Sequence, residues 1–290
     1  MTKGAFLPTF GNRPAHIVGR SSIARSFVDA LSEPVGHPVR SSLIIGQRGT
    51  GKTTLLKEFE ALARQKNFVP ALVTANEDML DDIIEAIQKN GAHYFASKRP
   101  EISGFTLGVA GLALGLTFER EVEDRLSFRF KLEMLCDALA EQDKGVLILV
   151  DEVQPNTSQI RSLAVNYQHL VGDNKNIALV MAGLPTSVSA VLHDDILTFL
   201  NRAHKIRLDP IPLSEIKEAY ATEFMKQGKE ISPGNLEQLA TASMGYPYMY
   251  QLIGFYTLTR LIAAEVIAPA GHGKLSIIVP YLGEYLRSKF

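Results

Sequence analysis

The sequence predicts an α/β fold in which helices cover both faces of a mostly parallel β-sheet, followed by a region of helices alone. Two patterns predict it. Strand-like apolar segments alternate with helix-like segments through most of the chain, and such alternation is typical of a parallel sheet. After Pro210 and Pro212 the periodicity is helical only. We therefore expect a loosely held lead-in at residues 1–15, a sheet-containing domain at 16–209 and a helical domain at 210–290.

The individual elements follow from the spacing of apolar residues. Repeats every three to four positions predict helices, and short continuous apolar runs predict buried strands. In the first part, the spacing predicts helices at 22–31, 53–64, 78–89, 125–142 and 186–199, and strands at 41–45, 68–74, 145–150, 176–182 and 204–208. In the second part, it predicts helices at 214–227, 233–244, 247–266 and 277–287.

Residues 105–118 have a different pattern. Their apolar residues alternate, and the alternation changes phase at Ala110 and Gly111, as expected for the two strands of a β-hairpin. A helix here would contain three interior glycines, each costing about 1 kcal/mol. The predicted hairpin either covers the domain's own core or docks a partner or DNA.

The composition is that of an ordinary globular protein. The 290 residues are 46% hydrophobic and 21% charged, with a formal net charge of −1, so nonspecific coating of nucleic acid is not expected. We see neither a signal segment nor the roughly 18 uninterrupted apolar residues of a membrane span. A cytoplasmic protein without membrane contact is expected. Cys136 is the only cysteine, which excludes an intrachain disulfide.

A glycine-rich loop follows the first strand-like segment. Residues 46–53 read GQRGTGKT, of the form GxxxxGKT. Such glycines let the backbone turn tightly and point its N–H groups at phosphates, at the start of the next helix. Lys52 would contact the β- and γ-phosphates, and Thr53 would bind Mg²⁺. The pattern predicts nucleotide binding by Gly46, Gln47, Arg48, Gly49, Thr50, Gly51, Lys52, Thr53 and Thr54.

Two acidic residues, Asp151 and Glu152, follow the apolar segment 145–150. Open α/β sheets bind their ligands at the carboxyl ends of strands. We expect Asp151 to hold Mg²⁺ and Glu152 to orient and activate the attacking water. Taken alone, the pair is also typical of a solvated strand end or a helix cap. Together with the glycine loop it predicts an ATPase.

With these motifs in place, residues 16–290 resemble the AAA+ ATPases. The resemblance is strongest to the prokaryotic branch of initiator and STAND-type switch ATPases, and it implies a P-loop NTPase core of αβα type with a C-terminal helical lid. Residues 17–20, IVGR, resemble the box beside the adenine, which Ile17 and Val18 would contact. Residues 245–247 resemble the glycine–proline signature, in which Tyr246 and Pro247 would touch the base. Both segments also have an interpretation without nucleotide contact. Residues 17–20 would then be a packing turn, and residues 245–247 would end one helix and begin the next with a proline.

Arg202 precedes the last predicted strand, where family members carry the arginine that completes a neighbouring subunit's site. The resemblance therefore implies a homo-oligomer in which Arg202 acts in trans. A lone arginine at this place is equally typical of a solvated helix end. Two departures weaken the resemblance to ring motors: Thr186 is the only candidate sensor after segment 176–182, and the lid lacks its usual arginine. Asn76 is a candidate to link nucleotide state to Glu152.

The leading hypothesis is a Mg²⁺-dependent ATPase that works as a nucleotide switch on an unidentified protein partner. Its cofactors are ATP or ADP and Mg²⁺, and its catalytic residues are Lys52, Glu152 and Arg202. The alternative is an ATP-dependent DNA-transaction module, resembling a transposition target selector or an initiator. Net charge does not support DNA binding, and we expect no winged helix after the last lid helix. A third hypothesis is that the protein is a scaffold that holds nucleotide without hydrolysing it. The sequence favours a small-molecule kinase less than these three.

Overall fold

A computed structural model describes residues 6–8, 17–95, 126–155, 158–195, 197–258, 267–269 and 275–277. The chain divides into two compact units. We call Ser22–Arg48 together with Lys52–Leu208 the sheet unit. The helical unit comprises Met1–Ser21, Gly49–Gly51 and Asp209–Phe290. Among the described helices, none combines the length and the apolar character that crossing a membrane requires.

The sheet unit contains five parallel strands in the order β2-β3-β4-β1-β5, which confirms the predicted fold class. β3 and β4 are buried along their whole length, and their aliphatic sequences are those of parallel strands covered on both faces. The strands are β1 (Ser41–Ile45), β2 (Phe68–Thr74), β3 (Gly145–Asp151), β4 (Ile177–Gly183) and β5 (His204–Arg207).

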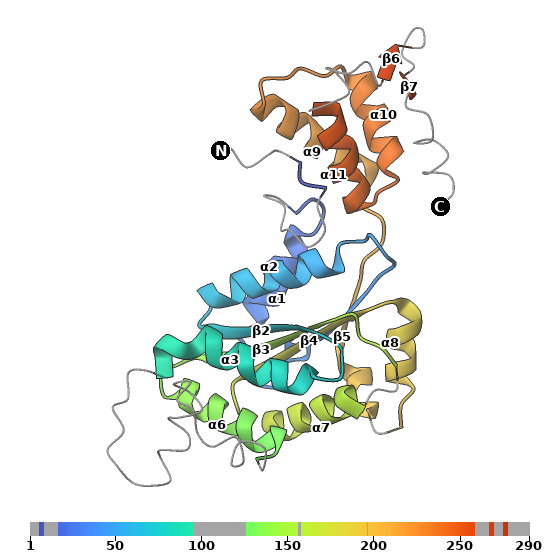
Figure 1. The fold of residues 1–290 in the computed structure, drawn as a ribbon. Coiled ribbons are helices and arrows are strands. Elements are labelled where there is room, and N and C mark those ends of the chain that lie inside the picture. The colour runs from blue at the N-terminus through green and yellow to red at the C-terminus, as the bar shows by residue number, and fades with distance from the viewer. Residues whose placement is uncertain are drawn as a thin grey trace. The chain divides into compact units, whose positions relative to one another are not determined.

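Helices cover the two faces of this sheet (Figure 1). Alternate residues of β3 serve opposite faces: Leu147 and Leu149 pack in the cluster formed with α1 and α2, whereas Ile148 packs in the cluster formed with α3, α6 and α7. This alternation is the two-residue period of a strand. The helices are α1 (Ser21–Ala30), α2 (Lys52–Gln65), α3 (Met79–Phe95), α6 (Phe128–Ala140), α7 (Ser158–Gly172) and α8 (Pro185–Leu192), with short 3₁₀ turns η1 (Pro38–Arg40) and η2 (Thr198–Arg202).

The helical unit has its own core. Helices α9 (Leu213–Lys226), α10 (Pro233–Ser243) and α11 (Pro247–Tyr256) enclose a cluster rich in aromatic rings. Further along, β6 (Ile267–Pro269) pairs antiparallel with β7 (Leu275–Ile277). The prediction of helices alone missed this pair, because periodicity does not reveal strands of three residues.

The lead-in was also predicted wrongly in part. Of residues 1–15, the structure describes 6–8, and there Phe6 is only 2% exposed in the core of the helical unit. The backbone N–H of Leu7 donates to Oε1 of Gln251 at 2.8 Å. Local sequence carries no signal for contacts between residues so far apart along the chain.

Two other predictions fall on residues outside the described ranges. The hairpin predicted at 105–118 lies there entirely. The helix predicted at 277–287 starts at a residue that belongs to β7, and its other residues lie outside as well.

Candidate nucleotide-binding site

The glycine loop lies between the carboxyl end of β1 and the first residue of α2. Its start continues the sheet, because the N–H of Gly46 donates to the carbonyl of Gly183 at the end of β4, at 3.3 Å. Gly49 and Gly51 have φ values of 79° and 89°, a left-handed conformation that glycine adopts without steric cost. Helix α2 begins at Lys52. The loop therefore has the strand–turn–helix setting that a phosphate-binding loop requires.

The Lys52 side chain folds back over this loop. Its Nζ donates to the carbonyls of Gly46 at 2.8 Å and Gln47 at 2.9 Å. Burial lowers the pKa of Lys52 below its ordinary value of 10.5, while Asp151 and Glu152 oppose that shift and Arg48 adds to it. A partly desolvated ammonium group at the loop interacts more strongly with an anion than one in water does.

Thr53 and Asp151 meet although they are far apart in sequence. Thr53 Oγ1 donates to Asp151 Oδ2 at 2.5 Å, and Asp151 is only 8% exposed. The meeting follows from strand order: β1 and β3 both flank β4 in a parallel sheet, so their carboxyl ends lie on one edge. A hydroxyl and a carboxylate side by side are hard oxygen donors of the kind Mg²⁺ prefers.

The described residues contain no cluster of three or more His, Cys, Asp or Glu side chains that could hold a metal alone. Mg²⁺ typically binds through one or two protein oxygens, with water and phosphate completing its six ligands. Two protein oxygens beside a phosphate-binding loop therefore fit Mg²⁺ bound together with a nucleotide.

Glu152 has an unusual backbone. Its φ is 56°, and its N–H donates to Asp151 Oδ1 at 2.9 Å. The next residue returns to the sheet, because the N–H of Val153 donates to the carbonyl of Ala182 at 2.9 Å. A left-handed non-glycine residue costs of order 1–3 kcal/mol and is commonest at functional sites. The kink leaves the Glu152 side chain exposed beyond the strand end.

Arg202 lies at the other end of the strands. It is exposed and is the last residue of η2, just before β5. β5 runs parallel to β1 with Ser42 opposite His204. Arg202 is therefore level with the start of β1, whereas the glycine loop follows its end. The structure does not bring Arg202 to the Lys52 and Asp151 of its own chain.

The four residues predicted to contact the base all belong to the helical unit. Ile17, Val18, Tyr246 and Pro247 are each half-buried. The loop segment Gly49–Gly51 groups with the same unit, and a Cβ added to Gly51 would lie 3.5 Å from Cγ of Pro247.

Arg20 is a residue of this region that the sequence analysis did not single out. Its guanidinium donates to the backbone carbonyl of Asp209 and is 9% exposed. Its position directly after Ile17, Val18 and Gly19 was the one feature of the sequence that could have marked Arg20 as part of this region.

Thr186 and Asn76 have no described contact with the acidic pair. Thr186 is exposed in the first turn of α8. Nδ2 of Asn76 lies 3.5 Å from Oδ2 of Asp82, a separation at the limit of a hydrogen bond. Within the described residues, the structure thus gives no link from Asn76 to Glu152.

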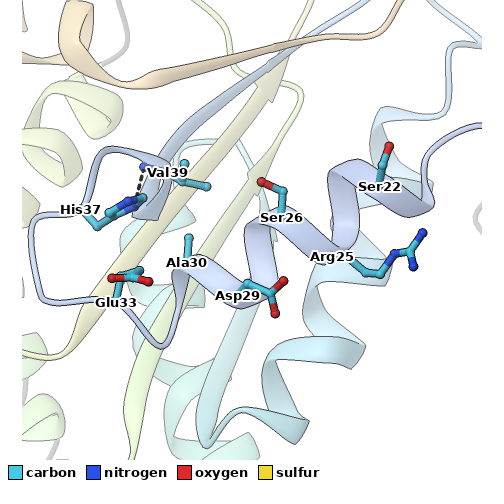
Figure 2. A pocket seen from close by; sticks show the side chains of 8 residues that line it. All are labelled: Ser22, Arg25, Ser26, Asp29, Ala30, Glu33, His37 and Val39. Carbon is cyan, nitrogen blue, oxygen red and sulfur yellow. Dashed lines mark hydrogen bonds between the residues drawn. The ribbon is translucent and has the colours of Figure 1, made fainter.

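A shallow surface depression lies elsewhere on the sheet unit. Figure 2 shows that most of its side chains come from α1 and the turn that follows it, with Val39 N–H donating to Nδ1 of His37 at 3.4 Å. None of the residues predicted to bind nucleotide lines this depression.

Several solved structures share this fold. The Walker-type ATPase paby2304 of Pyrococcus abyssi aligns with a TM-score of 0.57 at 17% identity, over 85% of this chain and 69% of that one. The ORC2 protein of Aeropyrum pernix, in its ADPNP–ADP complexes, aligns with a TM-score of 0.57 at 17% identity, over 89% and 66%. Cdc6p of Pyrobaculum aerophilum aligns with a TM-score of 0.54 at 19% identity, over 89% and 65%.

This chain spans about two thirds of the length of those proteins. At such identities the likeness concerns the fold alone. No curated protein matches the chain in sequence. A model of the AAA ATPase domain matches residues 16–180, which is more than half of the chain and includes the glycine loop and the acidic pair. The chain therefore belongs to the AAA ATPase domain family.

Proposed function

We propose that this protein is a Mg²⁺-dependent ATPase that acts as a nucleotide-dependent switch. The observation that carries the proposal is the meeting of Lys52, Thr53 and Asp151 at one edge of the sheet. Membership of the AAA ATPase domain family supports ATP as the nucleotide. The ADPNP and ADP bound to the ORC2 protein of the same fold add to that support.

Each residue has a distinct part in the proposed reaction. When nucleotide binds, the ammonium group of Lys52 leaves the carbonyls of Gly46 and Gln47 and contacts phosphate oxygens instead. Its positive charge then neutralises part of the negative charge of the phosphates. Thr53 and Asp151 would hold Mg²⁺, and the bound ion would stabilise negative charge on the phosphates. Glu152, whose carboxylate is exposed at the kink, orients the water that attacks.

The switch consists of closure of the helical unit over the nucleotide. Part of the binding energy of ATP drives closure, which changes the surface presented to a protein partner, and slow hydrolysis resets it. The base would be contacted by Ile17, Val18, Tyr246 and Pro247. All four residues belong to the helical unit, so this contact would link nucleotide binding to closure.

Two variants test the ATPase. Lys52→Ala should abolish binding of a fluorescent ATP analogue, whereas Glu152→Gln should bind it and release no phosphate. Arg64→Ala is the matched control: Arg64 lies on the same helix as Lys52, but its ion pair with Glu60 is on the surface. Continued hydrolysis by Glu152→Gln would refute the role given to Glu152. Wild-type protein that binds ATP and releases no phosphate would support the non-hydrolysing scaffold.

The switch is tested by comparing two states of one protein. Glu152→Gln would be loaded with ATP or with ADP, each with Mg²⁺, and its amide hydrogen exchange measured. Slower exchange at Ile17, Val18 and the start of α11 in the ATP state is expected. Equal exchange in the two states would rule the switch out while leaving the ATPase intact.

A second candidate function, ATP-dependent assembly on DNA, is favoured by a specific feature of β5. Arg202, His204, Lys205 and Arg207 are exposed within six positions, and no carboxylate of the described residues pairs with their side chains. Exposed basic side chains close together on one short segment are able to bind phosphates of duplex DNA. Fluorescence anisotropy with duplex DNA, with and without ATP, tests it. Absence of salt-dependent binding would reject it.

A further inference from the structure

Ile211 lies between two prolines in the segment that leads into α9. Pro210 and Pro212 flank it, and Pro212 is the residue that directly precedes the helix. A proline fixes its own φ and restricts the residue before it. The side chain of Ile211 is 2% exposed in the core of the helical unit. Ile211 therefore combines a stiff backbone with a side chain that has little freedom to move.

The side chain of Ile211 contacts Gly19. Gly19 has a φ of 68°, and a Cβ there would lie 2.7 Å from Cγ2 of Ile211. Val18, the residue before Gly19, is half-buried and packs against the same core as Ile211. On the other side of Gly19, the guanidinium of Arg20 donates to the carbonyl of Asp209. Side-chain packing and a hydrogen bond thus hold this short segment against the residues that lead into α9.

The backbone of Ile211 contacts a second glycine, Gly245. The N–H of Ile211 donates to the carbonyl of Gly245 at 2.8 Å. Gly245 has a φ of 79°, and a Cβ there would lie 2.8 Å from the carbonyl oxygen of Ile211. Tyr246 and Pro247 follow at once, and the N–H of Tyr246 donates to the carbonyl of Ser243 at 2.9 Å. The start of α11 is therefore fixed on Ile211.

The two segments predicted to contact the base thus meet on one residue of the helical unit. Gly19 directly follows the first predicted pair, Ile17 and Val18, and Gly245 directly precedes the second pair, Tyr246 and Pro247. We propose that Ile211 is a positioning residue that holds these two pairs at the spacing needed to contact the nucleotide base. This rests on the proposed nucleotide binding and extends it, because it assigns the geometry of base recognition to a residue that does not itself touch the ligand.

The physical basis is preorganisation. Groups that are already held at the right spacing lose little conformational freedom when the base arrives, whereas groups that move independently must be ordered by the ligand. Loss of the contact between Ile211 and Gly19 therefore weakens ligands that carry a base. A ligand that consists of phosphates alone depends on the glycine loop and Lys52, and it keeps its affinity.

The test measures the binding of ADP and of inorganic pyrophosphate, each with Mg²⁺, by calorimetry on the full chain. Two variants disturb one contact in opposite ways. Ile211→Ala removes the Cγ atoms that face Gly19, and Gly19→Ala adds a Cβ that collides with them. Both keep the backbone N–H of Ile211 that bonds to Gly245.

Two further variants are controls. Ile211→Val keeps both Cγ atoms and loses only the terminal methyl group. Leu239→Ala opens a cavity in the same core from α10 and leaves Ile211 and both glycines unchanged. A loss of stability alone is therefore separated from a loss of spacing between the two pairs.

Ile211→Ala and Gly19→Ala should each bind ADP about ten-fold more weakly or worse, and pyrophosphate within about two-fold of wild type. Ile211→Val should bind ADP nearly as wild type does, and Leu239→Ala should melt at lower temperature with unchanged ADP affinity. Unchanged ADP binding in the first two variants, or equal losses of ADP and pyrophosphate, would overturn the proposal. Wild type that binds neither ligand would overturn the proposed function as well, so the two failures are distinguishable.

Discussion

Lys52 combines burial with a charge that the proposed reaction needs. Burial lowers its pKa below the ordinary value of 10.5. As pH rises through that lowered pKa, Lys52 becomes neutral and phosphate affinity falls, at a pH where an exposed lysine would still be charged. We expect the affinity for Mg²⁺–ADP to show this alkaline decline when measured by calorimetry across pH.

Lys52→Arg is the control for that decline, because arginine keeps its charge throughout the range. Should it bind ADP, its affinity is expected to stay flat where that of wild type falls. An identical decline in both proteins would assign the titration to another group. The free energy of unfolding of the nucleotide-free protein should change in the opposite direction. Between the lowered pKa of folded Lys52 and the ordinary value of 10.5, the unfolded chain still holds the proton that the folded chain has lost. The free energy of unfolding therefore rises with pH in that range.

Thr53 offers a prediction about the metal. Its hydroxyl lies 2.5 Å from Asp151 Oδ2, and in the proposed function these two oxygens would hold Mg²⁺. Thr53→Ala should weaken ADP binding about ten-fold in Mg²⁺, a loss of about 1.4 kcal/mol, and by much less in chelator. Titrations with and without Mg²⁺ measure the difference. Thr53→Ser, which keeps the hydroxyl, should behave as wild type, and equal losses in the two buffers would contradict a metal role.

At the scale of elements, a buried cation joins the start of β1 to its neighbours. Arg40, 2% exposed, donates to Asn176 Oδ1 at 2.5 Å just before β4 and to the carbonyl of Leu31 after α1 at 3.4 Å. Its guanidinium carbon lies 5.2 Å from the ring centroid of Phe68 in β2. Nε of Arg40 has no partner among the described residues. This end of the sheet is therefore held by an incompletely satisfied charge.

Removing one partner of that charge should cost more than removing the charge itself. Asn176→Ala leaves the guanidinium buried with fewer acceptors and should lower the free energy of unfolding by about 1–3 kcal/mol. Arg40→Met should cost less, since apolar replacements of buried charges are often neutral. Urea denaturation measures both. Asp173→Ala, which breaks only the surface ion pair with Arg129, should stay within about 1 kcal/mol of wild type.

At the scale of the whole molecule, Arg202 predicts a dependence on neighbouring copies. Its own chain places it at the strand end opposite the glycine loop. If it completes the site of another copy, Lys52→Ala and Arg202→Ala should each be inactive alone, and an equimolar mixture should recover part of the ATPase rate. Arginine fingers contribute about 10³–10⁵-fold in rate, so recovery is easily detected.

A rate per chain that rises with protein concentration is the companion result in wild type. A mixture that stays inactive, together with a rate independent of concentration, would contradict the role of Arg202 in trans. The protein would then be a self-contained nucleotide switch.

The sequence by itself determined the fold class and the identity of the loop and the acidic pair. GQRGTGKT is contiguous, and its conformation depends on its own glycines. The acidic pair ends an aliphatic strand whose burial on both faces is visible in its composition. Local chemistry suffices for such features, because the residues that act together are neighbours in sequence or follow from one periodicity.

Only the tertiary structure decided which of these groups meet. Strand order brings Thr53 to Asp151 across 98 positions and places Arg202 at the other strand end. Packing within the helical unit buries Phe6 in its core. The left-handed φ of Glu152 also arises from packing, because Val153 must return to the ladder beside Ala182. Contacts between distant residues depend on how whole elements pack, and no local pattern of side chains encodes them.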